Sequence, residues 1–370
     1  MKLHRIGSAA AVLTVAALAL TACGSDSPTA TAGTDSSGSS AGAVSGTLTG
    51  SGASSQKAAM EAWKAGYEQA NSGAMVQYSP DGSGAGRKAF LAGGAQFAGS
   101  DAYLKDEEIE SSKEICGPEG AFNVPAYVSP IAVAFNLSGV ETLNLDAATI
   151  AKIFKLEITK WNDPAIAATN EGVELPDTAI TVVHRNDESG TTENFVEYLA
   201  AAAKDVWDYD VSGDWPSDLA SENAKGTSGV VATTTSTEGA ITYADFSAVG
   251  NLGTVNVKVG DDFTEISAEA AAKGVEAATP VEGRGAMDMS LDLKRDTTES
   301  GSYPIILVSY HVFCSTYKDQ ATVDLVKSFG KYVLSEEGQK EAEGSAGNAP
   351  LSAKMSEAAI KAIDSIKVAS

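Results

Sequence analysis

The sequence predicts an α/β protein with more than one lobe. Short apolar runs rich in β-branched and aromatic residues alternate along the chain with segments of helical periodicity, which is the pattern of an α/β fold. The chain has 370 residues, of which 43% are hydrophobic. This length exceeds what one average domain needs, so two lobes are the natural expectation.

The first 22 residues are predicted to be a lipoprotein signal peptide. Lys2 and Arg5 form a basic start, and residues 6–20 are apolar, Ala-rich and free of charge. This apolar stretch is too short to span a membrane comfortably. It ends in Leu-Thr-Ala-Cys at 20–23, which resembles a bacterial lipobox, where the Cys23 thiol carries lipid such as palmitate after cleavage. An ordinary signal peptide with an incidental cysteine is the alternative.

Residues 23–45 are predicted to form a flexible tether, because Gly, Ser, Thr and Ala dominate them and cannot bury apolar area. Ordered structure should begin near Gly46. A strand at 44–49 should lead into a helix with one face formed by Met60, Trp63, Tyr67 and Ala70.

The next elements follow the same alternation. A short strand is expected around Val76, and a helical stretch should begin near Arg87. Later strands are expected at 127–136, 179–184 and 303–313. Helices are expected at 147–154, 192–203 and 322–334. The segment 303–313 is far too short to cross a bilayer and is predicted to be a buried strand.

The charge of the chain argues against nucleic acid as a partner. The formal net charge is -23, from 26 Lys and Arg against 49 Asp and Glu. Such a surface repels polyanions and favours solubility.

Cys116 and Cys314 remain as a pair once Cys23 is assigned to lipid. In an oxidising compartment an even pair suggests a disulfide between distant parts of the chain. Two buried free thiols are the alternative.

Two glycine-containing segments are candidates for binding an anion. In Leu-Thr-Gly-Ser-Gly-Ala-Ser-Ser at 48–55, a strand runs into a helix start, and Ser54 or Ser55 as N-cap could share the free backbone N–H groups with an anion. Plain N-capping is the alternative.

The second segment is Asp-Gly-Ser-Gly-Ala-Gly at 81–86, where glycines permit close approach of a ligand. It has neither a Walker A ending nor dinucleotide spacing, so ATP and NAD are disfavoured, and a tight turn is the alternative.

Two further segments carry charged candidates. Asp101 stands just beyond a probable strand end, where Asp is more often a turn former. The segment Arg-Asn-Asp-Glu-Ser-Gly-Thr at 185–191 lies between a strand and a helix. Arg185 offers a planar fork for a tetrahedral oxyanion, and Asp187 could hold that fork in position. A bare capping turn explains Asp and Ser but not the whole set.

These four segments, in this order, resemble the PstS family, the phosphate-binding proteins of the high-affinity phosphate ABC transporter. The segments 160–167 and 239–243 also resemble family sequence. The resemblance covers most of the chain from about 46 to 370.

The resemblance implies a type II periplasmic-binding-protein fold, in which each of two lobes is a mixed sheet flanked by helices and a two-strand hinge joins them. Lobe I would comprise 46–128 and 305–370, and lobe II would comprise 129–304. One dehydrated phosphate would lie between the lobes. The matching positions are Ser54, Ser55, Ser83, Asp101, Arg185, Asp187, Ser189, Gly190 and Thr191.

The sequence also departs from the family pattern. Ser55 stands where a bulkier Phe is common, and Asp81 and Glu188 add carboxylates near the binding loops, which puts affinity in doubt more than identity. His184 stands where another Arg occurs and is interpreted as structural. We further expect Asp101 to accept the proton that phosphate carries and sulfate lacks.

The expected function is capture of inorganic phosphate outside the cell membrane and its delivery to the permease of an ABC importer. The protein is expected to be a monomer held to the membrane by its lipid, without cofactor or bound metal. An enzyme acting on phosphate esters is the main rival, but no nucleophile with an adjacent base stands out among 3 His and the paired cysteines. Other rivals are a receptor for sulfate or molybdate and a signalling or adhesive lipoprotein.

Overall fold

The computed structural model describes residues 44–369. The predicted signal peptide, Cys23 and nearly all of the predicted tether therefore lie outside the described residues. Within 44–369, no helix combines the length and the apolar character that a membrane crossing needs.

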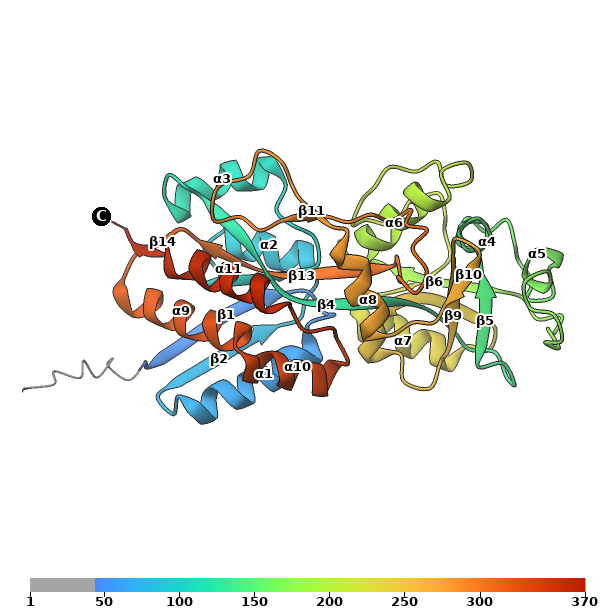
Figure 1. Cartoon of the computed structure of the whole chain (residues 1–370), viewed down its shortest axis with the longest axis horizontal. Helices are drawn as coiled ribbons and strands as arrows, with labels where there is room; N and C mark the ends of the chain where they lie inside the picture. The colour runs from blue at the N-terminus through green and yellow to red at the C-terminus, as the bar shows by residue number, and fades with distance from the viewer. Residues whose placement is uncertain (1–43, 370) are drawn as a thin grey trace, which may run out of the picture. The chain divides into compact units, whose positions relative to one another are not determined.

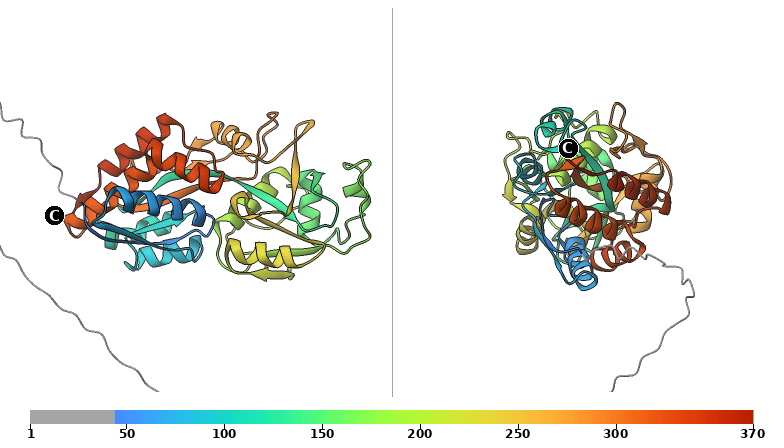
Figure 2. Two further views of the ribbon diagram at one scale, coloured as in Figure 1. Left: turned by 90° about the horizontal axis from the view of Figure 1, so that it is seen from below. Right: turned by 90° about the vertical axis from the view of Figure 1, so that its left-hand side faces the viewer.

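Lobe I is built from the two ends of the described chain. Figures 1 and 2 show the blue N-terminal and red C-terminal segments side by side. Its sheet contains the parallel strands β1 (Gly46–Gly52), β2 (Ala74–Ser79) and β3 (Phe97–Ser100), with β13 (Ile306–Cys314) antiparallel to β3. Its helices are α1 (Lys57–Ala70), α2 (Ser83–Leu91), α3 (Asp106–Cys116), α9 (Gln320–Leu334), α10 (Glu336–Ala346) and α11 (Ala353–Asp364).

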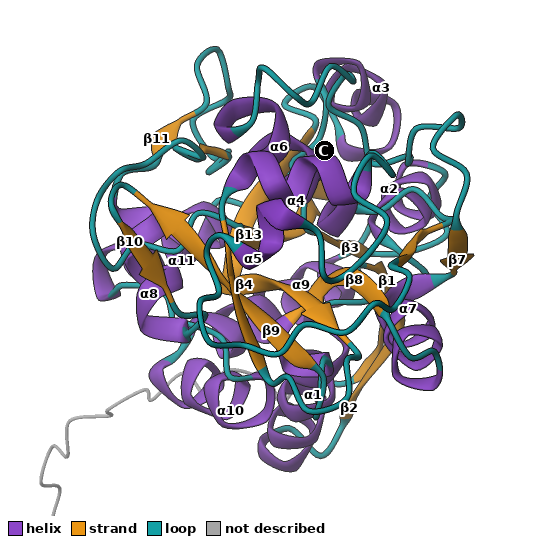
Figure 3. Cartoon of the chain, turned by 90° about the vertical axis from the view of Figure 1, so that its right-hand side faces the viewer, coloured by secondary structure: helices purple, strands orange, loops and turns teal. Residues whose placement is uncertain are grey.

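Lobe II is formed by the middle of the chain, and Figure 3 shows its helices arranged around strands. Its strands are β5 (Thr142–Leu145), β6 (Thr181–Arg185), β7 (Glu222–Ala224), β8 (Ala240–Asp245), β9 (Gly253–Val259) and β10 (Asp262–Thr264). Its helices are α4 (Ala147–Phe154), α5 (Pro164–Ala167), α6 (Gly190–Ala202), α7 (Gly226–Ser236) and α8 (Ala268–Glu276).

One long strand, β4 (Ala121–Phe135), belongs to both lobes (Figure 1). Its first part pairs with β13 in antiparallel register, and its last part, from Ile131, pairs with β8. The strand order β2-β1-β3-β13-β4-β8-β6-β7 is therefore continuous from one lobe to the other. This arrangement confirms the predicted two-lobed α/β fold.

Each lobe has its own aromatic cluster, which anchors the elements that lead to the site. In lobe I, Phe97 at the start of β3 packs on Phe329 of α9 with ring centroids 5.6 Å apart. In lobe II, Tyr243 of β8 stacks on Phe195 of α6 at 4.5 Å, and its hydroxyl accepts a hydrogen bond from the Arg185 backbone N–H at 3.3 Å. The core of lobe II thus fixes the end of β6.

Several predicted elements match the structure and others differ at their ends. The helix predicted at 147–154 is α4, capped by the Asp146 side chain, which accepts from the Thr149 N–H. The helix predicted around Met60 is α1, but Ala70 at its end is exposed. The strand predicted at 127–136 begins earlier, at Ala121, because β4 continues through Pro125, although proline normally interrupts a central strand.

The two predicted helix starts near the binding segments were wrong. The N-cap of α1 is Gln56, and no side chain caps this helix, so neither Ser54 nor Ser55 is its N-cap. Helix α2 begins at Ser83 and not near Arg87, so most of the predicted glycine turn is its first turn. The glycines allow this packing, because a Cβ on Gly86 would lie 2.3 Å from the Gly52 Cα.

The remaining segment of interest is the strap, which we define as residues 279–292. It contains the short strands β11 (Thr279–Pro280) and β12 (Leu291–Asp292). Asn123 of β4 donates its backbone N–H to Asp288 at 2.9 Å, and Arg284 lies 3.2 Å from Asp106 of α3. The strap therefore contacts elements of lobe I, although the predicted division assigns it to lobe II.

Cys116 at the end of α3 and Cys314 at the end of β13 form a disulfide, with Cα atoms 4.6 Å apart. Both cysteines are buried in lobe I. The bond joins positions separated by 198 residues in the sequence.

Candidate functional site

Asp101 lies at the centre of the candidate site, directly after β3. It is 3% exposed and accepts hydrogen bonds from three hydroxyl groups. The Ser55 Oγ lies 2.7 Å from both carboxylate oxygens, the Ser309 Oγ 2.7 Å from Oδ1, and the Thr191 Oγ1 3.0 Å from Oδ2. Burial raises the pKa of Asp101, while these hydroxyls and the charge of Arg185 oppose the increase.

The serines of the first loop face different partners. Ser55 is buried and points to Asp101, whereas the Ser54 hydroxyl lies 3.0 Å from the Thr227 hydroxyl of α7. Ser54 also accepts the Thr227 backbone N–H at 3.0 Å. The first loop of lobe I thus touches the start of a lobe II helix.

Ser83 stands at the first position of α2, next to the same carboxylate. Its Oγ accepts the Asp101 backbone N–H at 3.2 Å, and its side chain is buried. The preceding Gly82 has φ 108°, a conformation that favours glycine. This brings the N-terminus of α2 to Asp101, while the Gly84 N–H of its first turn donates to the Glu188 carbonyl at 3.2 Å.

The loop from Arg185 to Thr191 supplies the second half of the site. Arg185 ends β6, is 3% exposed, and donates from Nε to the Asp187 Oδ1 at 2.7 Å. Asp187 also accepts the Gly226 N–H at 3.0 Å. Burial pushes the pKa of Asp187 upward, but the hydrogen bond and charge of Arg185 together outweigh burial and hold the pKa below its usual value.

Helix α6 starts where this loop ends. Ser189 is its N-cap and accepts the Thr192 N–H at 3.2 Å. Gly190 has no space for a side chain, because a Cβ there would lie 2.8 Å from the Asp101 Cβ and 2.8 Å from the Ser83 Oγ. Two helix N-termini, of α2 in lobe I and α6 in lobe II, therefore meet at Asp101.

The structure thus gathers the nine residues predicted to bind the ligand at one interlobe region. Ser55, Ser83, Asp101, Gly190 and Thr191 are in direct contact there. The other four residues lie at the edge of this region. Ser54 contacts α7, and Ser189 caps α6. The Arg185–Asp187 pair packs against Gly82, where an added Cβ would lie 2.5 Å from the Asp187 Oδ2. Because β1, β3 and β6 all end here, the site occupies the usual position for ligands in open α/β sheets.

The two additional carboxylates of the binding loops are paired with cations of the opposite lobe. Glu188 lies 2.8 Å from the Arg87 Nη2 and 2.6 Å from the Lys88 Nζ, both on α2. Asp81 lies 3.3 Å from the Lys225 Nζ at the start of α7. Burial pushes the pKa of Glu188 upward, but Lys88 and Arg87 hold it below its usual value.

His184 takes no part in binding contacts. Its ring stacks on Trp215 with centroids 5.2 Å apart, and its Nδ1 lies 2.8 Å from the Arg185 carbonyl oxygen. Burial lowers the pKa of His184, which favours the neutral ring. It packs at the end of β6.

Sequence reasoning missed two residues that contact Asp101 from element interiors. Ser309 belongs to β13, and Asn194 belongs to α6, from which its side chain donates to the Asp101 carbonyl at 2.7 Å and to the Gly190 carbonyl at 2.8 Å. The one available signal for Ser309 was a small polar residue inside a mainly apolar strand.

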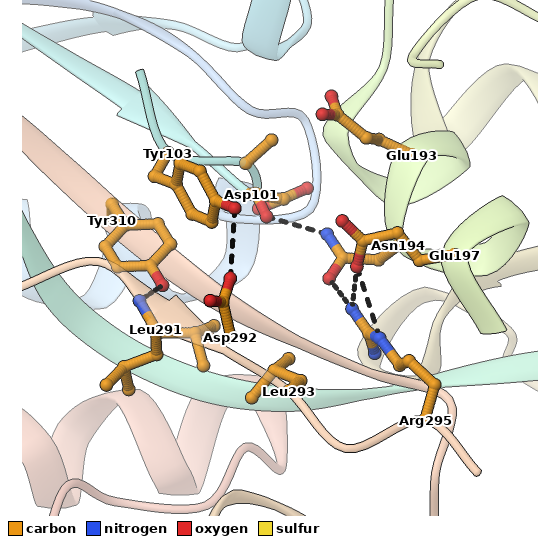
Figure 4. Close-up of a pocket in the computed structure, with 12 residues that line it drawn as sticks. Asp101, Tyr103, Glu193, Asn194, Glu197, Leu291, Asp292, Leu293, Arg295 and Tyr310 are labelled. Carbon is orange, nitrogen blue, oxygen red and sulfur yellow. Dashed lines mark hydrogen bonds and ion pairs between the residues drawn. The ribbon is translucent and has the colours of Figure 1, made fainter. Parts of the chain in front are cut away.

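A cavity of about 180 Å³ lies beside Asp101 (Figure 4). Its walls include Glu193, Asn194 and Glu197 of α6 and Asp292 of the strap, with Arg295 paired to Glu197 at 2.8 Å. Of the nine predicted residues only Asp101 lines it. The carboxylates of its walls disfavour an anion, so this cavity is not part of the candidate anion site. In the part of the chain that the structure describes, no cluster of three or more His, Cys, Asp or Glu could hold a metal ion.

The chain is similar to known proteins over most of its length. The family model for the PBP superfamily domain matches residues 37–337. Phosphate-binding protein PstS 2 of Mycobacterium tuberculosis is 39% identical over 345 residues, covering 89% of this chain and 90% of that protein. PstS 3 of Mycobacterium leprae is 39% identical over 339 residues with the same coverage. The chain belongs to the PstS family of phosphate-binding proteins.

Solved structures extend the PstS likeness to the fold. The phosphate-binding protein from Stenotrophomonas maltophilia aligns with a TM-score of 0.65 at 21% identity, covering 86% of this chain and 94% of that one. The ABC-type phosphate transport receptor from Vibrio cholerae aligns with a TM-score of 0.53 at 18% identity, covering 82% and 100%. A PstS-family chain is a solute-binding protein and not an enzyme.

Proposed function

We propose that this protein binds inorganic phosphate outside the cell membrane and delivers it to the permease of an ABC importer. Its relatives are phosphate-binding proteins. The ligand site we propose comprises Ser54, Ser55, Ser83, Asp101, Arg185, Asp187, Ser189, Gly190 and Thr191.

One observation carries this proposal: a buried carboxylate lies among oxyanion donors. Hydroxyls of Ser55 and Thr191 and the N-termini of two helices surround Asp101, with Arg185 as the nearby cation. Phosphate at neutral pH carries a proton that it can donate to Asp101, whereas sulfate does not. Sulfate would place oxygen against carboxylate, and a site built around a required hydrogen bond rejects such an analogue by about 10⁴ to 10⁵.

Isothermal titration calorimetry with phosphate and sulfate at pH 7 tests this function. We expect micromolar or tighter phosphate binding, which corresponds to about -8 kcal/mol or better, and weak sulfate binding. Thermal unfolding provides a second readout, since a ligand at 100 times its dissociation constant stabilises the fold by about 2.7 kcal/mol. Equal affinity for the two anions, or no binding of phosphate, would contradict the proposal.

The membrane attachment is proposed from the sequence. Residues 1–22 would be removed, Cys23 would carry lipid such as palmitate, and residues 23–45 would form the tether. Mass spectrometry of the mature N-terminus in a membrane fraction should find a lipid-modified Cys23. A Cys23→Ser variant that remains in the membrane fraction would contradict this attachment.

We also propose that the protein works as a monomer whose two lobes close on the ligand. The lobes would comprise 46–128 with 305–370, and 129–304, with the strap lying against lobe I. Closure would present a new surface to the permease. Small-angle scattering with and without phosphate should show a monomer that becomes more compact, and scattering unchanged by phosphate would argue against closure.

A further inference from the structure

Ser309 contacts Asp101 from the interior of lobe I. It is fully buried, and the register between β13 and β4 shifts between Ser309 and Tyr310. Such a bulge redirects a side chain away from the regular alternation of a strand. Here the Ser309 Oγ lies 2.7 Å from the Asp101 Oδ1.

Gln56 determines which way the Ser309 hydroxyl points. The Gln56 Nε2 lies 3.0 Å from the Tyr310 carbonyl oxygen, which can only accept, so this atom of the side chain is the amide nitrogen. The same Nε2 lies 2.7 Å from the Ser309 Oγ and can only donate to it. The single hydroxyl proton of Ser309 is therefore directed to Asp101.

The other two hydroxyls on Asp101 are not fixed in this way. Ser55 belongs to the first binding loop and Thr191 to the last, and both are residues of the proposed phosphate site. Ser309 stands outside the binding loops and is held by Gln56 as well as by Asp101.

A fixed donor matters because Asp101 is buried among groups that disfavour its charge. Tyr127 of β4 is fully buried and Tyr78 of β2 is partly buried, and these neutral phenols beside Asp101 take the place of water that would solvate its charge. Asp245 at the end of β8 adds like charge when ionised, and burial raises the pKa of Asp245 to about 7. Arg185 of β6 is the cation that offsets these groups. A hydrogen bond donated to the carboxylate favours its ionised form.

We propose that Ser309, held by Gln56, is a positioning residue that keeps Asp101 an ionised acceptor and so sets the preference for a protonated oxyanion over sulfate. The inference rests on the proposed phosphate site. It assigns selectivity to a residue outside the four binding loops. If Ser309 is removed, Asp101 takes up a proton at higher pH, and a protonated Asp101 can donate to sulfate.

The test compares Ser309→Ala and Ser309→Thr with the wild-type protein by calorimetry, using phosphate and sulfate between pH 5 and 8. We expect Ser309→Ala to lower the ratio of phosphate to sulfate affinity by about tenfold or more at neutral pH, since a hydrogen bond to a charged group is lost. The loss of selectivity on acidification should also begin at a higher pH. Ser309→Thr keeps the hydroxyl and should retain the wild-type ratio.

Ser315→Ala is the matched control. Ser315 is also a buried serine of lobe I, but it donates to the Cys116 carbonyl at 2.7 Å and not to Asp101. Its removal should leave the ratio and its pH dependence unchanged. A folded Ser309→Ala with the wild-type ratio at every pH would overturn the proposal.

A ligand-free measurement separates this inference from the proposed function. Carbon-13 NMR of the Asp101 carboxyl, assigned with Asp101→Asn, should show titration at higher pH in Ser309→Ala than in the wild-type protein. If Ser309→Ala does not fold, Ser309→Cys, which fills the site with a slightly larger group that is only a weak donor, should show the same direction of change. If the Asp101 titration is the same in Ser309→Ala and in the wild-type protein, the role of Ser309 is overturned even if phosphate binds. If the titration shifts but the protein does not bind phosphate, only the proposed function is overturned.

Discussion

At the residue scale, the environment of Asp101 determines what the site can recognise. Its position after a strand followed from the sequence, as did the types of residue in the four loops. Its contacts with Ser309 and Asn194 did not follow, because these residues lie in the interior of a strand and a helix that are distant in the chain. Local patterns identify loops at strand ends, whereas a contact between distant elements depends on their packing.

Replacement of Asp101 by Asn should reverse much of the selectivity. The amide can donate to an oxyanion without a proton, so sulfate affinity should increase and the ratio of phosphate to sulfate affinity should fall by about 100-fold or more. Calorimetry with both anions measures the change. Asp319→Asn, at the exposed N-cap of α9, is the control and should behave like the wild-type protein.

Asp245 should give the stability a distinct pH dependence. Burial raises its pKa in the folded protein from 3.8 to about 7, and its Oδ2 has no partner among the described residues. The folded state therefore holds a proton that the unfolded chain releases, and stability falls as the pH rises from about 4 to about 7. The maximum slope for one proton is about 1.4 kcal/mol per pH unit.

Urea unfolding of the wild-type protein and Asp245→Asn at pH 5 and pH 7.5 measures this effect. The variant cannot ionise at this position, so it should lose less stability between the two pH values than the wild-type protein does. The same loss in both proteins would show that Asp245 titrates normally.

At the element scale, helices with clear periodicity and a capping side chain were predicted well. Helix α4 has the predicted bounds because apolar positions repeat regularly after the Asp146 cap. The start of α2 was missed because Gly84 and Gly86 are poor helix formers. Their role is close contact: a Cβ on Gly84 would lie 2.4 Å from the Glu188 side chain, and the contact of Gly86 with Gly52 is similar.

Gly190 at the start of α6 provides a test of lobe contact. Alanine there should favour the helix but collide with Asp101 and Ser83. We expect Gly190→Ala to weaken phosphate binding by about 10- to 100-fold, as overpacking costs about 1 to 3 kcal/mol. Gly344→Ala in α10 is the control, because a Cβ there meets no atom within 4 Å. Unchanged phosphate affinity in Gly190→Ala would mean that the lobes need not approach this closely.

At the scale of the whole molecule, the sequence predicted two lobes but not how charge is arranged between them. The additional carboxylates looked unfavourable for an anion site. The structure shows that Glu188 and Asp81 neutralise cations of the opposite lobe, at distances that the linear sequence does not reveal.

The Glu188 contacts should stabilise the closed arrangement of the lobes. Arg87 is 1% exposed, so Glu188→Gln leaves part of its charge uncompensated when the lobes meet. Because Glu188 is partly exposed, we expect about a tenfold loss of phosphate affinity, mainly through faster release. Stopped-flow release at low and high salt measures it, and the salt dependence should be smaller in the variant.

The exposed pair Lys160–Asp177 lies within lobe II and supplies the control. Asp177→Asn should leave phosphate release unchanged at either salt concentration. If Glu188→Gln released phosphate at the wild-type rate, the ion pairs with Arg87 and Lys88 would not stabilise the closed arrangement of the lobes.

The disulfide has a consequence for the covalent topology of the chain. Because it links Cys116 to Cys314, the segment between them, which includes all of lobe II, is a closed ring whose ends meet in lobe I. A protease that cuts once in an exposed loop such as 171–174 would leave two pieces that stay attached until a reductant is added. Any attachment of the N-terminal piece would then also retain α9, α10 and α11, because the disulfide joins the two pieces.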